Sequence, residues 1–124
     1  MAKGTAKALA RQIEEMITKK TGILSKAQAL ATMGLGETAQ PVWASAASYE
    51  EQIASLLDAH GDDLEAAVHR ISAASCYQKA GDPSRATNLY RAALAGPLRE
   101  VTRKEVEAML SECLTLLKDA ARVG

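Results

Sequence analysis

The chain has 124 residues, a length that suits one domain with a modest hydrophobic core. Hydrophobic residues make up 48% of it, which excludes a wholly disordered chain, whereas aromatic residues make up 3% and Phe is absent. A core of Ala, Leu, Ile and Met favours closely packed helices over a β-sandwich. The formal net charge is zero, so no overall charge draws the chain to nucleic acid or to a membrane surface. We therefore predict a single all-α domain over residues 1–124.

The cysteine content and the hydropathy of the chain indicate the cellular compartment in which it is expected. The chain has two cysteines, Cys76 and Cys113, which are too few for a disulfide framework. Charges interrupt the segment after Met1, so it lacks the continuous apolar run of a signal peptide, and no stretch is long enough to span a bilayer. We expect a cytoplasmic protein that has no membrane partner.

Apolar residues recur at three- and four-residue steps in two runs near the N-terminus. The first run predicts a helix over residues 5–20, ended by Gly22, and the second predicts a helix over residues 23–33, ended by Gly34. The glycines after the second run do not predict a phosphate-binding loop, because no strand precedes them and no Gly-Lys-Ser/Thr follows. Residues 1–40 are therefore expected to form a helical hairpin and a loop.

Four further helices are predicted in residues 41–124, where turn and capping residues separate the apolar stripes. Trp43, the only Trp, is expected to anchor the core, with a partly exposed contact residue as the alternative. Thr102 and Glu105 form a capping box at the start of the last helix. That helix is expected to cover the preceding hairpin, and a dimer contact is the alternative. The four helices are predicted over residues 41–60, 62–80, 83–95 and 102–122.

Residues 67–98 combine small residues, tyrosines and a turn in one helix–turn–helix pattern. Gly81 can take the left-handed conformation that ends a helix, Asp82 is a good N-cap, and Pro83 suits the first position of the next helix. Small residues let the two helices approach closely, and tyrosines fill the space beside them. The positions that carry the pattern are Ala74, Tyr77, Gly81, Asp82, Ala86, Tyr90 and Ala93.

This pattern resembles one tetratricopeptide repeat, a helix–turn–helix unit of about 34 residues. One repeat does not bury its own apolar faces, so neighbouring helices must complete the fold. The expected architecture is a stack of about six antiparallel helices with tetratricopeptide-like hairpins and a C-terminal covering helix. The resemblance implies a non-enzymatic adaptor or scaffold that binds another protein or a peptide. Self-association as a homo-oligomer remains open beside it.

Tetratricopeptide domains usually bind their partners in a concave groove lined by the first helix of each pair. Some members grip a C-terminal carboxylate with a Lys and Asn clamp, but Ser75 stands here where that Asn would be expected. The clamp is therefore not predicted. The resemblance implies that the groove is lined by Val68, Ile71, Ser75, Gln78 and Lys79 on the first helix, and by Thr102, Glu105, Met109 and Glu112 on the last helix.

The residue types that carry chemistry form no motif typical of an enzyme. His60 and His69 lie nine residues apart and the cysteines form no CxxC, so no metal and no cofactor are predicted. No catalytic residue is predicted either, although a small helical enzyme or ligand-binding protein stays open as an alternative. A nucleic-acid-associated protein is a further alternative that the lack of interleaved aromatic residues disfavours. It would use the basic residues of segment 85–104, which are Arg85, Arg91, Arg99, Arg103 and Lys104.

Overall fold

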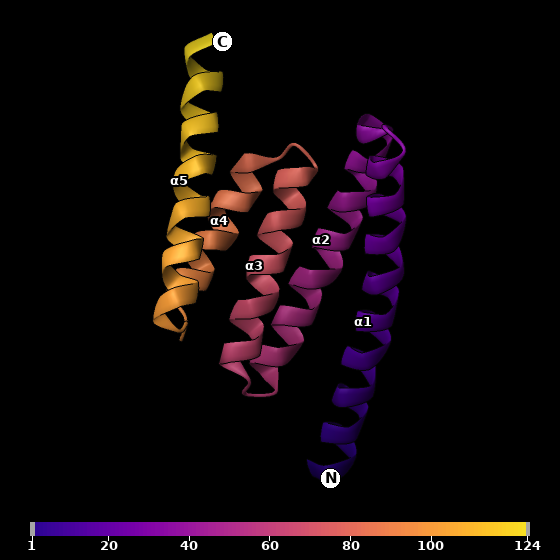
Figure 1. Ribbon diagram of the computed structural model, residues 1–124. Helices are drawn as coiled ribbons and strands as arrows, with labels where there is room; N and C mark the ends of the chain where they lie inside the picture. Colours follow the sequence, from indigo (N-terminus) through magenta and orange to yellow (C-terminus); the bar gives the residue numbers. More distant parts are fainter. Residues whose placement is uncertain (1, 124) are drawn as a thin grey trace.

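The computed structural model describes the backbone of residues 2–123 and the side chains of residues 6–122. Within that range the chain forms five α-helices and no strand, which confirms the all-α prediction. Consecutive helices run antiparallel, and each packs chiefly on its neighbours in sequence (Figure 1). None of these described helices combines the length and the apolar character needed to cross a membrane. The helices are α1 (Ala2–Thr32), α2 (Gly36–Ala59), α3 (Asp63–Lys79), α4 (Pro83–Leu94) and α5 (Glu100–Val123).

The N-terminal region forms one helix where the sequence predicts two, so the prediction of six helices is wrong. Gly22 lies inside α1 and does not end it. A glycine inside a helix costs about 1 kcal/mol. The packing of the next turn outweighs that cost, because Ala27 is buried in the main core and Ile23 and Leu24 pack against it. The hairpin predicted within residues 1–40 is therefore absent, and α1 pairs with α2 instead.

Helix α2 begins at Gly36, ahead of the start predicted at Pro41. The first helical hydrogen bond runs from the backbone N–H of Ala39 to the carbonyl oxygen of Leu35, over 2.9 Å. Pro41 therefore lies inside the helix, close enough to its start that only one backbone bond is lost. The connection between α1 and α2 is a short turn around Gly34 and not the longer loop that the sequence predicts.

The turn between α3 and α4 follows the local signals in the sequence. Gly81 has a φ of 81°, the left-handed conformation that suits glycine after a helix end. The side chain of Asp82 accepts a hydrogen bond of 3.1 Å from the backbone N–H of Arg85, and Pro83 is the first residue of α4. Because these residues close α3 and open α4 within three positions, the two helices are held antiparallel and adjacent.

Two clusters of buried residues form the core. The main cluster involves all five helices, and within it Trp43 is 7% exposed and Tyr90 is fully buried. Trp43 thus anchors the core, as the sequence predicts. Alanines occupy many of the other buried positions, which lets the helix backbones approach closely. A smaller cluster, centred on Ile13 and Ile53, joins α1, α2 and α3 at the other end of these helices.

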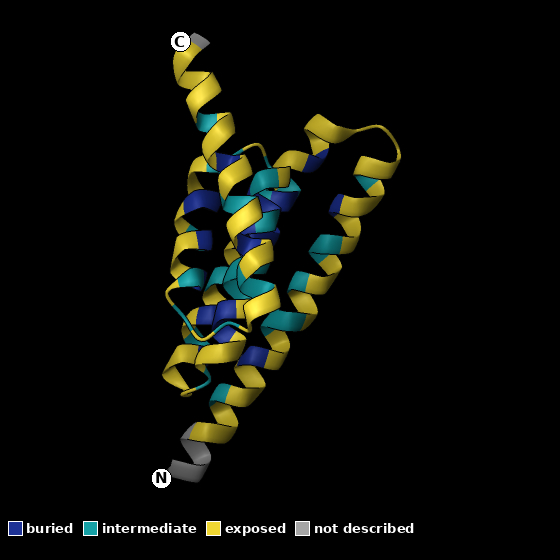
Figure 2. Ribbon diagram, turned by 60° about the vertical axis from the view of Figure 1, so that its left-hand side comes forward, coloured by how far each residue is buried: buried dark blue, intermediate teal, exposed yellow. Residues whose placement is uncertain are grey.

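The first and last helices extend past the rest of the fold at opposite ends. The N-terminal end of α1 continues beyond the α2–α3 turn, and the C-terminal end of α5 continues beyond the α3–α4 turn (Figure 1). Figure 2 shows that the projecting part of α5 is mostly exposed. On α5 the fully buried residues are Val106 and Cys113, and no residue from 114 to 122 is fully buried, so the chain covers the last part of this helix least.

Candidate functional site

One face of α3 is left partly open between α1 and α5. Val68 and Lys79 are both exposed and lie on the same face, because they are eleven residues apart, or about three helical turns. Ser72 and Ser75 lie between them at positions that continue the stripe, and both are partly exposed. We call this line of four residues the α3 stripe. A surface hollow adjoins each of its ends.

The first hollow adjoins the Val68 end of the stripe and has a volume of about 260 Å³. It lies between α3 and the start of α5, and both Val68 and Thr102 contribute to its lining. Val68 is 41% exposed, so an apolar side chain is available at this hollow. The lining residues are Leu64, Glu65, Val68, Leu98, Arg99 and Thr102.

The second hollow adjoins Lys79 and has a volume of about 780 Å³. The ammonium of Lys79 lies 4.5 Å from the centroid of the Trp43 ring, close enough for a cation–π interaction. Met33, which is 70% exposed, contributes to the rim. The lining residues come from α1 and its C-terminal turn (Leu24, Ser25, Gln28, Ala29, Thr32 and Met33), from α2 (Trp43) and from α3 (Lys79).

Three of the residues expected to line the groove also contribute to the core. The Tyr90 hydroxyl donates a hydrogen bond to Oε1 of Gln78 and lies 3.5 Å from Sδ of Met109. Ile71 and Met109 are partly buried and pack against the main cluster. These side chains therefore hold α3, α4 and α5 together, and a substitution at any of them would disturb the packing as well as the surface.

The remaining expected positions on α5 are exposed. Glu105 and Glu112 lie on one face of the helix, seven residues apart. Leu116 continues that face one turn further and is 50% exposed. Leu116 is not among the residues expected from the sequence, although its spacing of four residues from Glu112 places it on the same face.

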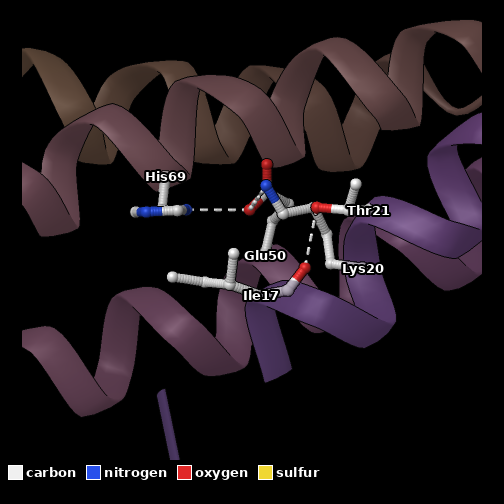
Figure 3. Close-up of polar contacts among 5 residues, drawn as sticks. All are labelled: Ile17, Lys20, Thr21, Glu50 and His69. Carbon is white, nitrogen blue, oxygen red and sulfur yellow. Dashed lines mark hydrogen bonds and ion pairs between the residues drawn. The ribbon is translucent and has the colours of Figure 1, made fainter. Parts of the chain in front are cut away.

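A buried ionic cluster holds α1, α2 and α3 together (Figure 3). The Glu50 carboxylate on α2 is only 2% exposed, and its Oε1 lies 2.8 Å from Nδ1 of His69 on α3. The same oxygen lies 3.7 Å from Nζ of Lys20 on α1. This cluster is not predicted from the sequence. The sequence feature that could have revealed the cluster is the position of Glu50, which lies four residues after Ala46 and three before Ile53 on the buried face of α2.

A third hollow, of about 590 Å³, lies between α2 and α4 across α3. The Tyr77 hydroxyl donates a hydrogen bond of 2.6 Å to Oε1 of Glu51, and the Arg85 guanidinium lies 5.6 Å from the Tyr77 ring centroid. Burial and Glu51 raise the pKa of the Tyr77 hydroxyl to about 12, so it remains a proton donor at neutral pH. The other lining residues are Ser48, Gln52, Ser55, Asn88 and the apolar Leu89.

The two cysteines are buried, free thiols. Burial and the neighbouring Glu50 raise the pKa of the Cys76 thiol to about 11. Burial, followed by the charge of Glu112, also raises the pKa of Cys113. Since the thiolate is the nucleophilic form, neither side chain is suited to covalent catalysis near neutral pH. Within the described residues, no group of three or more His, Cys, Asp or Glu side chains is placed to hold a metal ion.

Two basic residues of segment 85–104 are engaged within the chain. Arg103 donates hydrogen bonds to the carbonyl oxygens of Leu94 and Gly96, over 2.7 and 3.1 Å. Arg85 lies 3.5 Å from Asp82. The basic segment therefore presents fewer free cations to a nucleic acid than its sequence suggests.

Comparisons with known proteins add no family to this description. The chain matches no family model, and neither the curated proteins nor the solved structures gave a significant match.

Proposed function

We propose that this chain is a non-enzymatic interaction module that binds a peptide or a protein face along the α3 stripe, in a tetratricopeptide-like groove. The observation that carries the proposal is the exposed stripe with a hollow at each end. The resemblance of residues 67–98 to a tetratricopeptide repeat supports it, because α3 and α5 would then be the first helices of successive pairs. Such first helices line the groove in that family.

The spacing of the two hollows suits a short extended segment. Val68 and Lys79 are separated by eleven residues of helix, which corresponds to about 16 Å at 1.5 Å per residue. An extended peptide rises about 3.3 Å per residue, so about five residues span this distance. A bound segment would therefore place one apolar side chain in each hollow, with its backbone running over the hydroxyls of Ser72 and Ser75.

Charge around the groove specifies the polar part of the partner. Lys79 provides a cation beside the Trp43 hollow, so we expect a carboxylate near the apolar side chain that occupies this hollow. Glu105 and Glu112 are exposed on the α5 side, where we expect a Lys or Arg of the partner. The partner is thus a segment with two apolar anchors and charges of both signs.

Selection from a library of random peptides tests the proposal. The immobilised wild-type chain would be used to select binders, and their affinity would then be measured for groove variants. Val68→Glu and Lys79→Glu are suitable because both side chains are exposed and neither belongs to the buried core. We expect each to weaken binding by about tenfold or more, the loss typical of a central anchor or of a charge reversal beside it.

A matched control uses the opposite side of the molecule. Ser55→Glu introduces the same charge into the third hollow and should leave peptide binding unchanged. Equal binding of the selected peptides to the wild type and to both groove variants would reject the groove. Failure to select any peptide from a library of sufficient length would reject peptide binding at this face.

The third hollow supports a second candidate function, which is the binding of a small polar ligand. The observation in its favour is the convergence of Glu51, Tyr77 and Arg85 within one hollow. Thermal-shift screening of polar metabolites tests it. A ligand that stabilises the wild type but not Glu51→Gln would support this function, and no such ligand would leave the hollow a surface feature.

A further inference from the structure

The second half of α5 presents apolar side chains that the rest of the chain does not cover. α5 has 24 residues whereas α4, against which it packs, has 12. Beyond Cys113, Leu114 is 39% exposed although Leu117 is partly buried. This part of α5 also extends past the α3–α4 turn (Figure 1). A helix that carries leucines beyond the body of its own domain is suited to packing against another helix.

Apolar side chains form a seam along one edge of α5, in which Leu114 and Ala121 are exposed, Leu117 is partly buried and Leu110 packs against the main core. Leu110, Leu114, Leu117 and Ala121 follow one another at steps of four, three and four residues. This is the spacing of the apolar positions in a coiled coil. The seam lies on a different face from Glu105, Glu112 and Leu116, because successive residues of an α-helix are rotated by about 100°. It is therefore separate from the proposed groove.

Charges beside the seam indicate what covers it. Glu107 lies at one end of the seam and Lys118 at the other, and both are exposed. They are eleven residues apart, which places them on the same edge of the helix. If two α5 helices pair in antiparallel fashion about a point between residues 112 and 113, Glu107 of each copy faces Lys118 of the other. A parallel pair would instead align like charges.

We propose that the chain forms a two-fold symmetric dimer through antiparallel packing of two α5 helices along this seam. Leu110 of one copy then packs beside Leu114 of the second copy, and the two Glu107–Lys118 pairs flank the apolar contact. Such an interface is self-complementary, as two-fold symmetry requires. It is also distinct from the groove, so each copy can still bind a partner along its α3 stripe.

This arrangement includes one like-charge contact. The register places Arg103 opposite Arg122 of the second copy. The guanidinium of Arg103 is already engaged, because it donates hydrogen bonds to the carbonyl oxygens of Leu94 and Gly96. These hydrogen bonds hold it against its own chain, but it keeps its positive charge, so the contact lowers the stability of the dimer.

Sedimentation velocity over a range of protein concentrations tests the dimer. We expect a reversible monomer–dimer equilibrium, and Leu114→Lys should leave only monomer because it places a cation in the seam. Glu107→Lys and Lys118→Glu should each weaken association by about fivefold or more, because each creates two like-charge contacts per dimer. The double variant Glu107→Lys with Lys118→Glu should restore association, because it re-forms both ion pairs in reversed order.

Asp119→Lys is the matched control for Glu107→Lys. It makes the same change of charge at an exposed residue on the opposite face of α5 and should leave association unchanged. Circular dichroism checks that every variant keeps its helices. A wild type that stays monomeric up to about 1 mM would overturn the proposal, since even weak interfaces associate at that concentration. A double variant no better than the single variants would overturn the antiparallel register.

Discussion

Nδ1 of His69 lies 2.8 Å from the Glu50 carboxylate, which is only 2% exposed to solvent. The contact joins α3 to α2, and Lys20 brings α1 to the same oxygen (Figure 3). A buried carboxylate is costly unless its charge is compensated. The cluster therefore holds α3, which forms one wall of the proposed groove, against α1 and α2. Loss of the cluster should lower the free energy of unfolding.

Replacement of His69 should destabilise the chain. In His69→Ala, the Glu50 carboxylate loses its closest partner while it remains buried, and Lys20 is left at 3.7 Å. We expect the free energy of unfolding to fall by about 2–3 kcal/mol, as measured by urea denaturation. Adding Glu50→Gln to His69→Ala should recover part of this loss, because the amide carries no charge. A loss below about 0.5 kcal/mol in His69→Ala would contradict a structural role for the contact.

Stability should decrease at alkaline pH. The pKa of Cys76 is raised to about 11 in the folded chain, against about 8.5 for an unperturbed thiol. The unfolded chain therefore loses its thiol proton at a lower pH than the folded chain. The contribution of the Cys76 thiol to stability is complete below about pH 8.5 and is lost as the pH rises through 11. Tyr77 and Tyr90, with pKa values raised to about 12, act in the same direction at higher pH. Unfolding followed between pH 7 and 11 measures the decrease.

A Cys76→Ala variant separates the thiol from the other groups that titrate in this range. The decrease in stability between pH 8.5 and 11 should be smaller in the variant than in the wild type, whatever its stability at pH 7. The same decrease in both chains would show that the Cys76 thiol does not contribute.

Thiol-modifying reagents should react slowly with the native chain. Cys76 and Cys113 are buried, and the pKa of each thiol is raised. Because the reagent needs an accessible thiolate, the reaction with a chromogenic disulfide at pH 7 should follow the opening of the fold. In denaturant both thiols should react at once. Rapid reaction of the folded chain at neutral pH would contradict the burial of these side chains.

Removal of the Tyr90 hydroxyl should weaken the junction of α3, α4 and α5. The ring is fully buried, and the hydroxyl donates a hydrogen bond to Gln78. Tyr90→Phe keeps the ring but leaves the Gln78 oxygen without this donor, so we expect a loss of about 1–2 kcal/mol in urea denaturation. Tyr49→Phe is the control, because the Tyr49 hydroxyl has no hydrogen bond to the described residues. Equal losses in the two variants would contradict the role of the Gln78 contact.

The single tryptophan should report on the second hollow. The Lys79 ammonium lies 4.5 Å from the centroid of the Trp43 ring, which is 7% exposed. Lys79→Ala removes the side chain that lies over the Trp43 ring, so acrylamide should quench the Trp43 fluorescence more strongly. The free energy of unfolding should fall by about 0.5–1 kcal/mol. Lys26→Ala on the exposed surface of α1 is the control. Unchanged quenching in Lys79→Ala would contradict the contact between the two side chains.

Several features of the fold could be predicted because they depend on residues adjacent in the chain. The turn at Gly81 and Asp82 is one, since a left-handed glycine and an N-cap carboxylate act within three or four residues. The all-α class is another, because the helical spacing of apolar residues recurs in every segment.

Other features were decided only when the helices packed. The local signal at Gly22 predicts a helix end, but α1 continues because its next turn is buried against the rest of the core. Lys20, Glu50 and His69 are far apart in sequence and meet because three helices place them around one oxygen. The amino-acid sequence by itself determined the helical class and the turn between α3 and α4. The tertiary structure decided the number of helices, the buried ionic cluster and the hollows beside α3, since each depends on contacts between segments whose relative positions no local pattern specifies.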